Sequence, residues 1–509
     1  MVNFATETRV DVLRQAGHLL DTENRRLHQR LEALTKELAV WRNQDPDKLQ
    51  LELLRLEELV NQRNHELFGD SSERRSSSSP SSEPKTKDEQ PGHGPTEQPD
   101  LPVITDVCEL DEADRMCPKC GGHLDEMEGQ SEDSEEIDII ERRLVLRKKK
   151  KRKYRCACNA CVETAPGPEK LIPGGRYSVD FAVHVATDKY SDSLPWDRQV
   201  KRFARDGLKV TVATLWDQCE ALARHLQPLM PKLRAYLLSL AVLGADETWW
   251  RLMDRRRNGG TNKKWWAWAI AADDAVYFEI RKERSSDAVL DLLVEFGGIL
   301  IVDGHGAYKK GLKRGARYVL AFCWSHCRRK WLAASKSYPR EAGAIMDLID
   351  HLFRIDRKVA RGPPGSQEAL DERRRLRDEE SRWVVKALEC WALEMKVLPQ
   401  SSLGRALKYM VDHWKGLVRF LDDPRIPLSN NHTEREVRGP VVGRKNFGGC
   451  KSERGMEVTA LFYSLVGSAK LAGVDPRAYL KAMAFAAIRG EELLLPHEYA
   501  ASFAKEPAE

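Results

Sequence analysis

Three acidic residues stand in sequence contexts that suit chemistry on phosphate. Glu434 lies within Ile426–Gly449, a segment dense in arginine and lysine, and Asp246 and Asp303 each follow an apolar, strand-like run. Carboxylates that converge are costly unless cations neutralise them, and hard divalent ions prefer oxygen ligands. The three residues therefore predict a phosphoryl-transfer site that holds two Mg²⁺ (or Mn²⁺) ions about 4 Å apart.

The elements that must position these carboxylates can be read from the hydrophobic pattern. From residue 237 to 335 the pattern predicts a strand ending at Asp246, a hairpin, a helix, a strand ending at Asp303, then a further strand and helix. This order is typical of a ribonuclease-H-like core, in which the first strand neighbours the fourth. Glu247 should point to the opposite face of its strand. Asp246 and Asp303 should then lie side by side.

The rest of this core is predicted to follow a long interruption. Residues 336–425 carry helical patterns and predict an all-helical insertion, and residues 426–490 complete the core. A helix that begins at Ser429, Asn430 or Asn431 should carry Glu434. Residues 491–509 form a C-terminal tail.

Cations surround Glu434 in the sequence. Arg438 shares its helical face at a distance of four residues, Arg435 is adjacent, and Arg444 and Lys445 follow. A surface salt bridge is the ordinary explanation for one such pair. Because the carboxylate and the cations occur together, we favour contacts from these four cations to DNA phosphates.

A cysteine-rich segment, residues 106–170, predicts a zinc-binding β segment. Six of the eleven cysteines of the chain fall here, and clustering in a short basic stretch favours metal over disulfides. Two pairs with a spacing of two residues predict a structural Zn²⁺ site, with Cys156 as a spare or competing ligand. The predicted ligands are Cys117, Cys120, Cys158 and Cys161.

Between these cysteine pairs, residues 137–154 predict two strands that end in seven consecutive cations. Such a run repels itself unless phosphates neutralise it, although a solvated charge run is the alternative. Its position beside a zinc turn favours contact with the DNA backbone. The cations are Arg147, Lys148, Lys149, Lys150, Lys151, Arg152 and Lys153.

The N-terminal region predicts assembly. In residues 1–70 leucines recur every seven residues, and a second apolar row runs beside them in the same heptad repeat. Asn24 falls in this second row, a pattern typical of a two-stranded coiled coil and hence of a homodimer. An amphipathic helix that packs on its own domain is the alternative. Residues 71–105 lack apolar patterning and predict a disordered linker. Residues 171–236 predict a helical, helix-turn-helix-like DNA-binding region whose second helix starts at Thr211 or Thr214, with an ordinary helical bundle as the alternative.

Length and composition set the frame for these assignments. The chain has 509 residues, 32% of them charged, and Lys plus Arg exceed Asp plus Glu by 83 to 78. Roughly three domains of about 150 residues are expected, so the fold class is multidomain α+β or α/β. No apolar run reaches the ~18 residues that span a bilayer, and no secretory segment is evident. We therefore expect a cytoplasmic protein, associated with the nucleoid when bound to DNA, and no membrane partner.

Taken together, the motifs resemble a transposase of the insertion sequence 66 family, within the DDE superfamily. LFGDSSER, CPKCGG, ADET, VDGHGAY, CWSHCRRKW, NNHTEREVRGPVVGRKN and SLVGSAKLAGVDPRAYL follow that family's order over nearly the full chain. The resemblance implies that Asp246, Asp303 and Glu434 form the catalytic triad, and that His326 belongs to a family motif. It implies binding to the terminal inverted repeats of a mobile element, metal-dependent DNA cleavage, transfer of the 3'-hydroxyl to target DNA, and small accessory transposition proteins.

Two other functions fit parts of the sequence. A DNA-binding regulator derived from a transposase would use the coil, the zinc segment and the helical region while the core stays silent. The intact set of three carboxylates argues against this function. A stand-alone ribonuclease-H-like nuclease would share the core but would not predict a dimer that binds paired DNA ends. Strand-transfer products would distinguish these two enzymes.

Overall fold

The computed structural model describes Ala33 and residues 144–155, 162–253, 263–359, 366–395 and 397–503. Apart from Ala33, the predicted coiled coil lies outside the described residues, as do the linker and all four predicted zinc ligands. The described helices and strands belong to one compact unit. Among them, no helix is long and apolar enough to cross a membrane.

A mixed sheet of five strands forms the centre of this unit, in the order β5-β4-β3-β6-β7. β4 pairs with β3 and with β5 in antiparallel fashion, whereas β6 pairs with β3, and β7 with β6, in parallel. Their bounds are β3 Val242–Leu252, β4 Lys263–Ala271, β5 Val276–Arg281, β6 Ile299–Val302 and β7 Val319–Phe322. The predicted pairing of the first core strand with the fourth is confirmed, as is the mixed α/β class.

One strand boundary differs from the prediction. Asp246 does not end its strand but lies in the middle of β3, which continues to Leu252. On one side β6 pairs only with Val242–Gly244, whereas on the other side β4 pairs with β3 as far as Leu252. Asp246 therefore lies just beyond the end of its parallel neighbour. Asp303 follows the last residue of β6, as predicted.

Two helices cover the face of the sheet on which the site is built. Helix α14 (Asn431–Phe447) packs on β3 and β4, and α15 (Glu453–Leu471) packs on β5. In α15, Ser464 and Ser468 accept hydrogen bonds from β5 backbone N–H groups at 2.8 and 2.9 Å. These serines satisfy donors that the edge strand β5 would otherwise leave unpaired.

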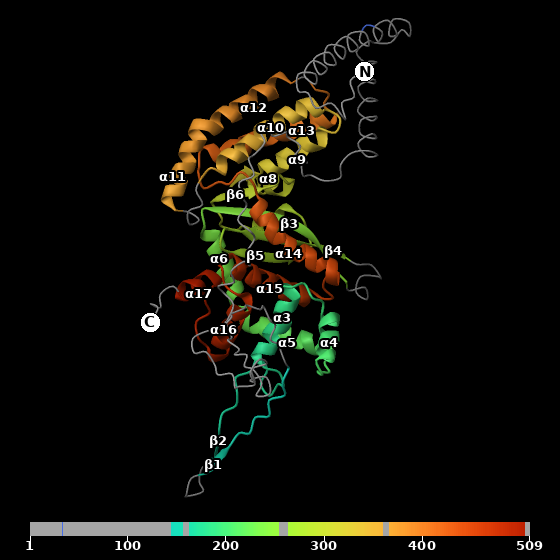
Figure 1. Cartoon of the computed structure of the whole chain (residues 1–509), viewed down its shortest axis with the longest axis vertical. Coiled ribbons are helices and arrows are strands. Elements are labelled where there is room, and N and C mark those ends of the chain that lie inside the picture. The colour runs from blue at the N-terminus through green and yellow to red at the C-terminus, as the bar shows by residue number, and fades with distance from the viewer. Residues whose placement is uncertain are drawn as a thin grey trace, which may run out of the picture. The chain divides into compact units, whose positions relative to one another are not determined.

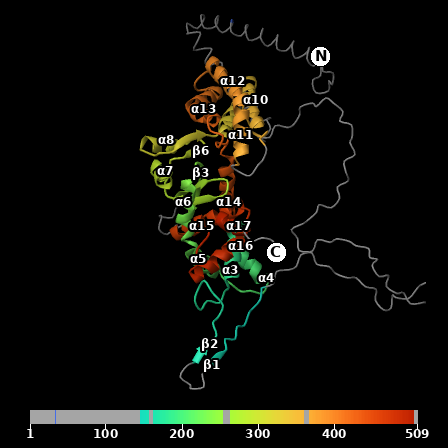
Figure 2. The ribbon, with the colours of Figure 1, turned by 90° about the vertical axis from the view of Figure 1, so that its left-hand side faces the viewer.

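Further helices gather at the two ends of the sheet (Figures 1 and 2). Beyond the β7 edge lie α9, α10, α11, α12 and α13, and the described residues between 336 and 425 contain no strand. Their bounds are α9 Trp324–Ala334, α10 Pro339–Asp356, α11 Gln367–Leu376, α12 Arg382–Glu394 and α13 Ser402–Leu417, with a π-helical turn at Arg377–Ser381 and a 3₁₀ turn at Val418–Leu421. Two short helices, α7 Ser286–Leu292 and α8 Gly306–Lys313, flank β6 in sequence.

At the β5 end, α15 packs against α3 and α5 among the helices that precede the core, and against α16 and α17, which follow it. The preceding helices are α3 Val179–Tyr190, α4 Trp196–Arg205, α5 Val212–Leu226 and α6 Leu229–Ser239, and the following ones are α16 Pro476–Arg489 and α17 Pro496–Phe503. The second helix of the predicted helix-turn-helix pair begins after Thr211, whose side chain accepts the N–H of Thr214 at 3.2 Å. This bond is the usual N-terminal cap of a helix.

The predicted pair of strands that ends in the basic run is wrong for those of its residues that the structure describes. Residues 144–152 lie in no strand, and β1 (Lys153–Arg155) pairs instead with β2 (Val162–Thr164). Consecutive lysines and arginines repel one another and are poor strand formers, so pairing begins only where the run ends. The cations Arg147 to Lys153 are all exposed.

Candidate active site

The parallel pairing of β3 and β6 fixes where Asp246 and Asp303 lie. Both strands run in the same direction, so residues beyond their paired segment emerge at the same edge of the sheet. Asp303 is held by one local and one long-range hydrogen bond: its Oδ1 accepts the N–H of His305 at 2.8 Å, and its carbonyl accepts the Tyr409 hydroxyl at 2.5 Å. The backbone that carries this carboxylate is thus anchored on α13.

Helix α14 brings Glu434 to the same edge. Asn430, the residue before the helix, donates from Nδ2 to the Ala245 carbonyl at 2.8 Å, which ties the helix start to β3 beside Asp246. Gly244 permits this approach, because a Cβ there would lie 2.0 Å from the hydroxyl of Thr433. Glu434 therefore enters the site in the first turn of α14.

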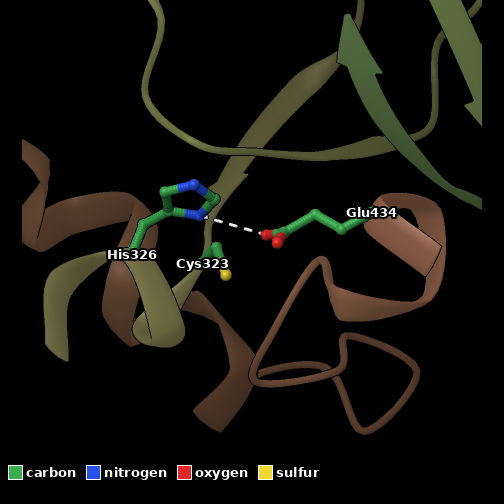
Figure 3. Close-up of side chains that lie close together, drawn as sticks. All are labelled: Cys323, His326 and Glu434. Atoms are coloured by element: carbon green, nitrogen blue, oxygen red, sulfur yellow. Dashed lines mark ion pairs between the residues drawn. The ribbon is translucent and has the colours of Figure 1, made fainter. Parts of the chain in front are cut away.

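Side chains from α9 surround the Glu434 carboxylate. Arg329 donates from Nη2 to Oε2 at 2.7 Å, and His326 Nδ1 lies 3.4 Å from Oε1. Figure 3 shows His326 and Glu434 pointing toward one another, with Cys323 beside them. In the described part of the chain, these last three residues form the group whose metal-ligating atoms all lie within 4.8 Å of one another. Asp246 and Asp303 are not members of that group.

The hydrogen bonds decide which atoms of this group can bind a cation. An arginine only donates, so the 3.0 Å contact from Arg329 Nη1 makes His326 Nε2 an acceptor and leaves the proton of a neutral ring on Nδ1. Burial lowers the pKa of His326, and Arg329 lowers it further, which favours the neutral ring. His326 thus presents N–H, not a lone pair, to Glu434.

Cys323 is also a poor ligand in this arrangement. Its sulfur accepts the backbone N–H of Asn430 at 3.2 Å, and burial raises the pKa of its thiol. Metals bind the thiolate, so a buried thiol already used as an acceptor is disfavoured. The chemistry of the donors therefore favours the three carboxylates, with Cys323 and His326 as supports of α14.

The electrostatics of Asp246 fit a cation site. Burial raises the pKa of Asp246 from 3.8 to about 7, and Glu247 is the next largest cause. Asp303 and Glu434 raise it as well, so the three predicted site carboxylates interact. Glu434 Oε1 and the His326 Nδ1 that faces it at 3.4 Å are in addition both buried without a hydrogen-bond partner. Repelling carboxylates and a buried acceptor without a partner are the features that a divalent cation would resolve.

Glu247, next to Asp246, plays a different part. It lies on the opposite face of β3, where Arg284 contacts Oε1 at 2.6 Å and the Tyr308 hydroxyl donates to Oε2 at 2.8 Å. His305 Nδ1 lies 3.7 Å away. This buried carboxylate is fully paired within the fold, so its role is structural.

The predicted DNA-contacting cations of α14 occupy two faces of the helix. Arg435, Arg438 and Lys445 are exposed. Arg444 is buried: it donates to the Thr248 hydroxyl at 3.1 Å and to the Trp249 carbonyl, and its guanidinium lies 3.6 Å from the Trp249 ring centre. Arg444 thus anchors the end of α14 on β3.

Sequence reasoning did not assign Cys323 and Arg329 to the site. Their signal is a spacing of three residues, Cys323, His326 and Arg329, which places successive side chains near one face at the start of a helix. Arg329 on this face contacts the carboxylate of Glu434, which lies 105 residues further along the chain. No local pattern predicts that contact.

Comparison with known proteins adds an independent result. The model of the "Transposase IS66 family" matches residues 174–458. Three similar chains come from Sinorhizobium fredii (strain NBRC 101917 / NGR234). The uncharacterized protein y4jD is 33% identical over 386 residues, 72% of this chain and 73% of its own length. The uncharacterized protein y4qI is 31% identical (68% and 66% covered), and y4hP is 26% identical (72% and 69% covered).

Proposed function

The chain belongs to the IS66 transposase family, and we propose that it is the DDE transposase of a bacterial insertion sequence. It binds the terminal inverted repeats of its element, cleaves DNA there, and joins the freed 3'-hydroxyl to target DNA. The strand order β5-β4-β3-β6-β7 supports a ribonuclease-H-like core. One observation carries the proposal: Asn430 fastens the start of the Glu434 helix to the backbone of Ala245, beside Asp246.

In this proposal Asp246, Asp303 and Glu434 hold two Mg²⁺ or Mn²⁺ ions. When bound, the ions supply charge neutralisation and the polarisation of water and of the phosphate. Water attacks the phosphorus, the bond to the 3'-oxygen of the element strand breaks, and that oxygen leaves as a 3'-hydroxyl. In the second step the hydroxyl attacks a target phosphorus, and a target 3'-oxygen leaves.

The protein's own side chains prepare these steps. Asp246, whose pKa lies at about 7 without a cation, becomes a fully ionised ligand when positive charge arrives. Arg329 and His326 face the two oxygens of Glu434 and fix the plane of its carboxylate. Preorganised ligands of this kind reduce the cost of reaching the reactive geometry.

The other parts of the proposal rest on the sequence. The exposed run Arg147 to Lys153 binds the DNA backbone, together with Arg435, Arg438 and Lys445. Residues 1–70 form a homodimer, small accessory proteins assist transposition, and the protein works in the cytoplasm. A structural Zn²⁺ is held by Cys117, Cys120, Cys158 and Cys161.

The test is magnesium-dependent cleavage and joining of labelled element-end DNA by the purified protein. Asp303→Asn and Glu434→Gln should lose both activities and still bind DNA. Glu436→Gln is the matched control, because Glu436 lies on the same helix two residues after Glu434 and is outside the site; it should remain active.

Other outcomes would contradict the proposal. Equal DNA binding without cleavage in all four proteins, with accessory proteins supplied, would indicate a regulator. Cleavage without joined products would indicate a nuclease.

A further inference from the structure

Helix α4 carries a cationic face that the proposed catalytic site does not use. Arg198, Lys201 and Arg205 are exposed and share one side of the helix, at spacings of three and four residues. With Leu194 and Arg202 they line a cavity of about 250 Å³. Within the described residues, no carboxylate forms an ion pair with any of these three cations.

The fold uses only one cation of this group. Arg202 donates to Asp188 of α3, a buried carboxylate that also lies 3.7 Å from Arg477 of α16. This contact fixes α4 on α3 and directs its remaining cations outward. Like charges three and four residues apart destabilise a helix by a few tenths of a kcal/mol per pair. An anionic partner would remove that cost.

The end of α14 lies against the beginning of α4. Asn446 donates from Nδ2 to the Ser193 carbonyl at 3.1 Å. Ser193 directly precedes Leu194, which lines the α4 cavity. The buried ammonium of Lys189 lies 3.6 Å from the ring centre of Trp196 in α4 and 4.3 Å from that of Phe447 in α14. The two helices are thus held together by a shared cation.

The exposed cations of α14 lead toward this junction. Arg435, Arg438 and Lys445 lie three and seven residues apart, which places them along one side of the helix. Arg435 adjoins Glu434, and Lys445 adjoins Asn446 at the junction. Cations therefore extend from the candidate site to α4.

We propose that α14 and α4 form one cationic track for the backbone of duplex DNA, which runs from the cleaved phosphate at Glu434 across Arg198, Lys201 and Arg205. This inference rests on the proposed function, because that function places the cleaved bond at Glu434. The separation from Glu434 to Asn446 along α14 is roughly 18 Å at 1.5 Å per residue, or about five base pairs at 3.4 Å each. The α4 cations contact phosphates about five to ten base pairs from the cleaved bond.

The packing of the neighbouring helix α5 leaves α4, and not α5, as the helix of this pair that presents cations to DNA. In a helix-turn-helix the second helix enters the major groove and the first crosses the backbone. Here α5 packs against α3, α15 and α16, and its Arg224 pairs with its own Glu220 at 2.5 Å. The first helix, α4, carries the cations that face outward. Contacts to phosphate are independent of base sequence, so the track positions the DNA and does not select it.

The test compares two labelled duplexes that contain the element end: a long one, and one truncated about five base pairs from the cleaved bond on the α4 side. The variant replaces Arg198, Lys201 and Arg205 by alanine in the full-length protein. On the long duplex its affinity should fall about 10- to 100-fold, and the slope of log K against log salt should decrease by about 2 to 3. On the short duplex it should bind as the unaltered protein does.

The matched control removes three exposed cations outside both helices, Lys310, Lys313 and Arg317. An equal loss of affinity in this control, or a loss by the α4 variant on both duplexes, would overturn the track. Thermal unfolding checks that the exposed substitutions leave stability unchanged. Asp303→Asn should keep the full salt slope, so a failure of the proposed catalysis and a failure of the track give different results.

Discussion

Replacing Asp246 by asparagine should stabilise the metal-free protein above neutral pH. The pKa of this carboxyl rises from 3.8 to about 7 on folding, mainly because it is buried and secondly because Glu247 is near. A rise of that size corresponds to at most about 4 kcal/mol of destabilisation when the group is ionised, at 1.36 kcal/mol per pKa unit. Asparagine has nearly the same shape and carries no charge.

The direction of this stability change, and the pH range over which it develops, follow from the linkage between proton binding and folding. Below about pH 4 the carboxyl of Asp246 is protonated in both the folded and the unfolded chain, so the substitution should change stability little. Between about pH 4 and pH 7 the unfolded chain releases its proton while the folded chain retains it, so the unaltered protein loses stability as pH rises. Above about pH 7 both states are ionised and the advantage of asparagine is constant.

The measurement is thermal unfolding in the presence of a chelator, across pH values from about 4 to 8. The unfolding temperature of Asp246→Asn should exceed that of the unaltered protein by several degrees at the alkaline end and by almost nothing at the acidic end. Added Mg²⁺ should stabilise the unaltered protein more than the variant, because the ion binds the ionised carboxylate.

Glu247→Gln is the matched control on the same strand. Glu247 is buried but paired with Arg284 at 2.6 Å, so its loss leaves a cation without a partner and should destabilise the protein by about 3 to 5 kcal/mol. The two neighbouring substitutions are therefore expected to have opposite signs at alkaline pH. If Asp246→Asn destabilised the chelated protein at every pH, the inference that burial and carboxylate repulsion strain this site would be refuted.

Three further substitutions test the packing that positions the site. Gly244→Ala places a methyl group 2.0 Å from a threonine hydroxyl of α14 and should cost about 1 to 3 kcal/mol in thermal unfolding and reduce DNA cleavage. Gly343→Ala in α10, where a Cβ would meet no atom within 4 Å, should be neutral or stabilising. Arg329→Ala should lower the cleavage rate about 10- to 100-fold. Arg329→Lys should restore only part of it, because lysine lacks the planar pair of Nη donors that contacts the imidazole and the carboxylate from two separate nitrogens. Arg377→Ala should destabilise the protein by about 3 to 5 kcal/mol in denaturant unfolding, because this buried arginine bonds the carbonyls that precede α14, whereas the exposed Arg382→Ala should cost less than about 1 kcal/mol. Equal effects within any of these three pairs of variants would contradict the packing argument.

The sequence predicted those parts of the core that local pattern determines. Short apolar runs followed by a single acid predicted the strand that ends before Asp303, and the order of strands and helices predicted that β3 neighbours β6. The end of the first strand was not predicted, because strand length depends on both neighbours. β4 pairs with β3 for several residues after β6 has ended.

The inner face of α14 could have been predicted more fully. Thr433, Val437, Pro440 and Arg444 are buried and recur every three or four residues. This periodicity places Arg444 on the packed face, although a run of cations alone suggests exposure. The support of Glu434 by α9 could not be predicted from local pattern, since it depends on a contact between segments 105 residues apart.

Helix α14 links three requirements that the sequence presents separately. Its first turn carries Glu434, its last turn is anchored by Arg444 on β3, and its end contacts the loop before α4 through Asn446. Because α14 is one helix held at both ends, the Glu434 carboxylate and the cations that lead to α4 keep a constant separation along its axis. In the proposed track, the position of DNA on α4 and the geometry of the carboxylates would therefore depend on the same element. Substitutions that loosen either end of α14 should therefore impair two measured quantities together: the rate of DNA cleavage and the additional affinity for the long duplex over the short one.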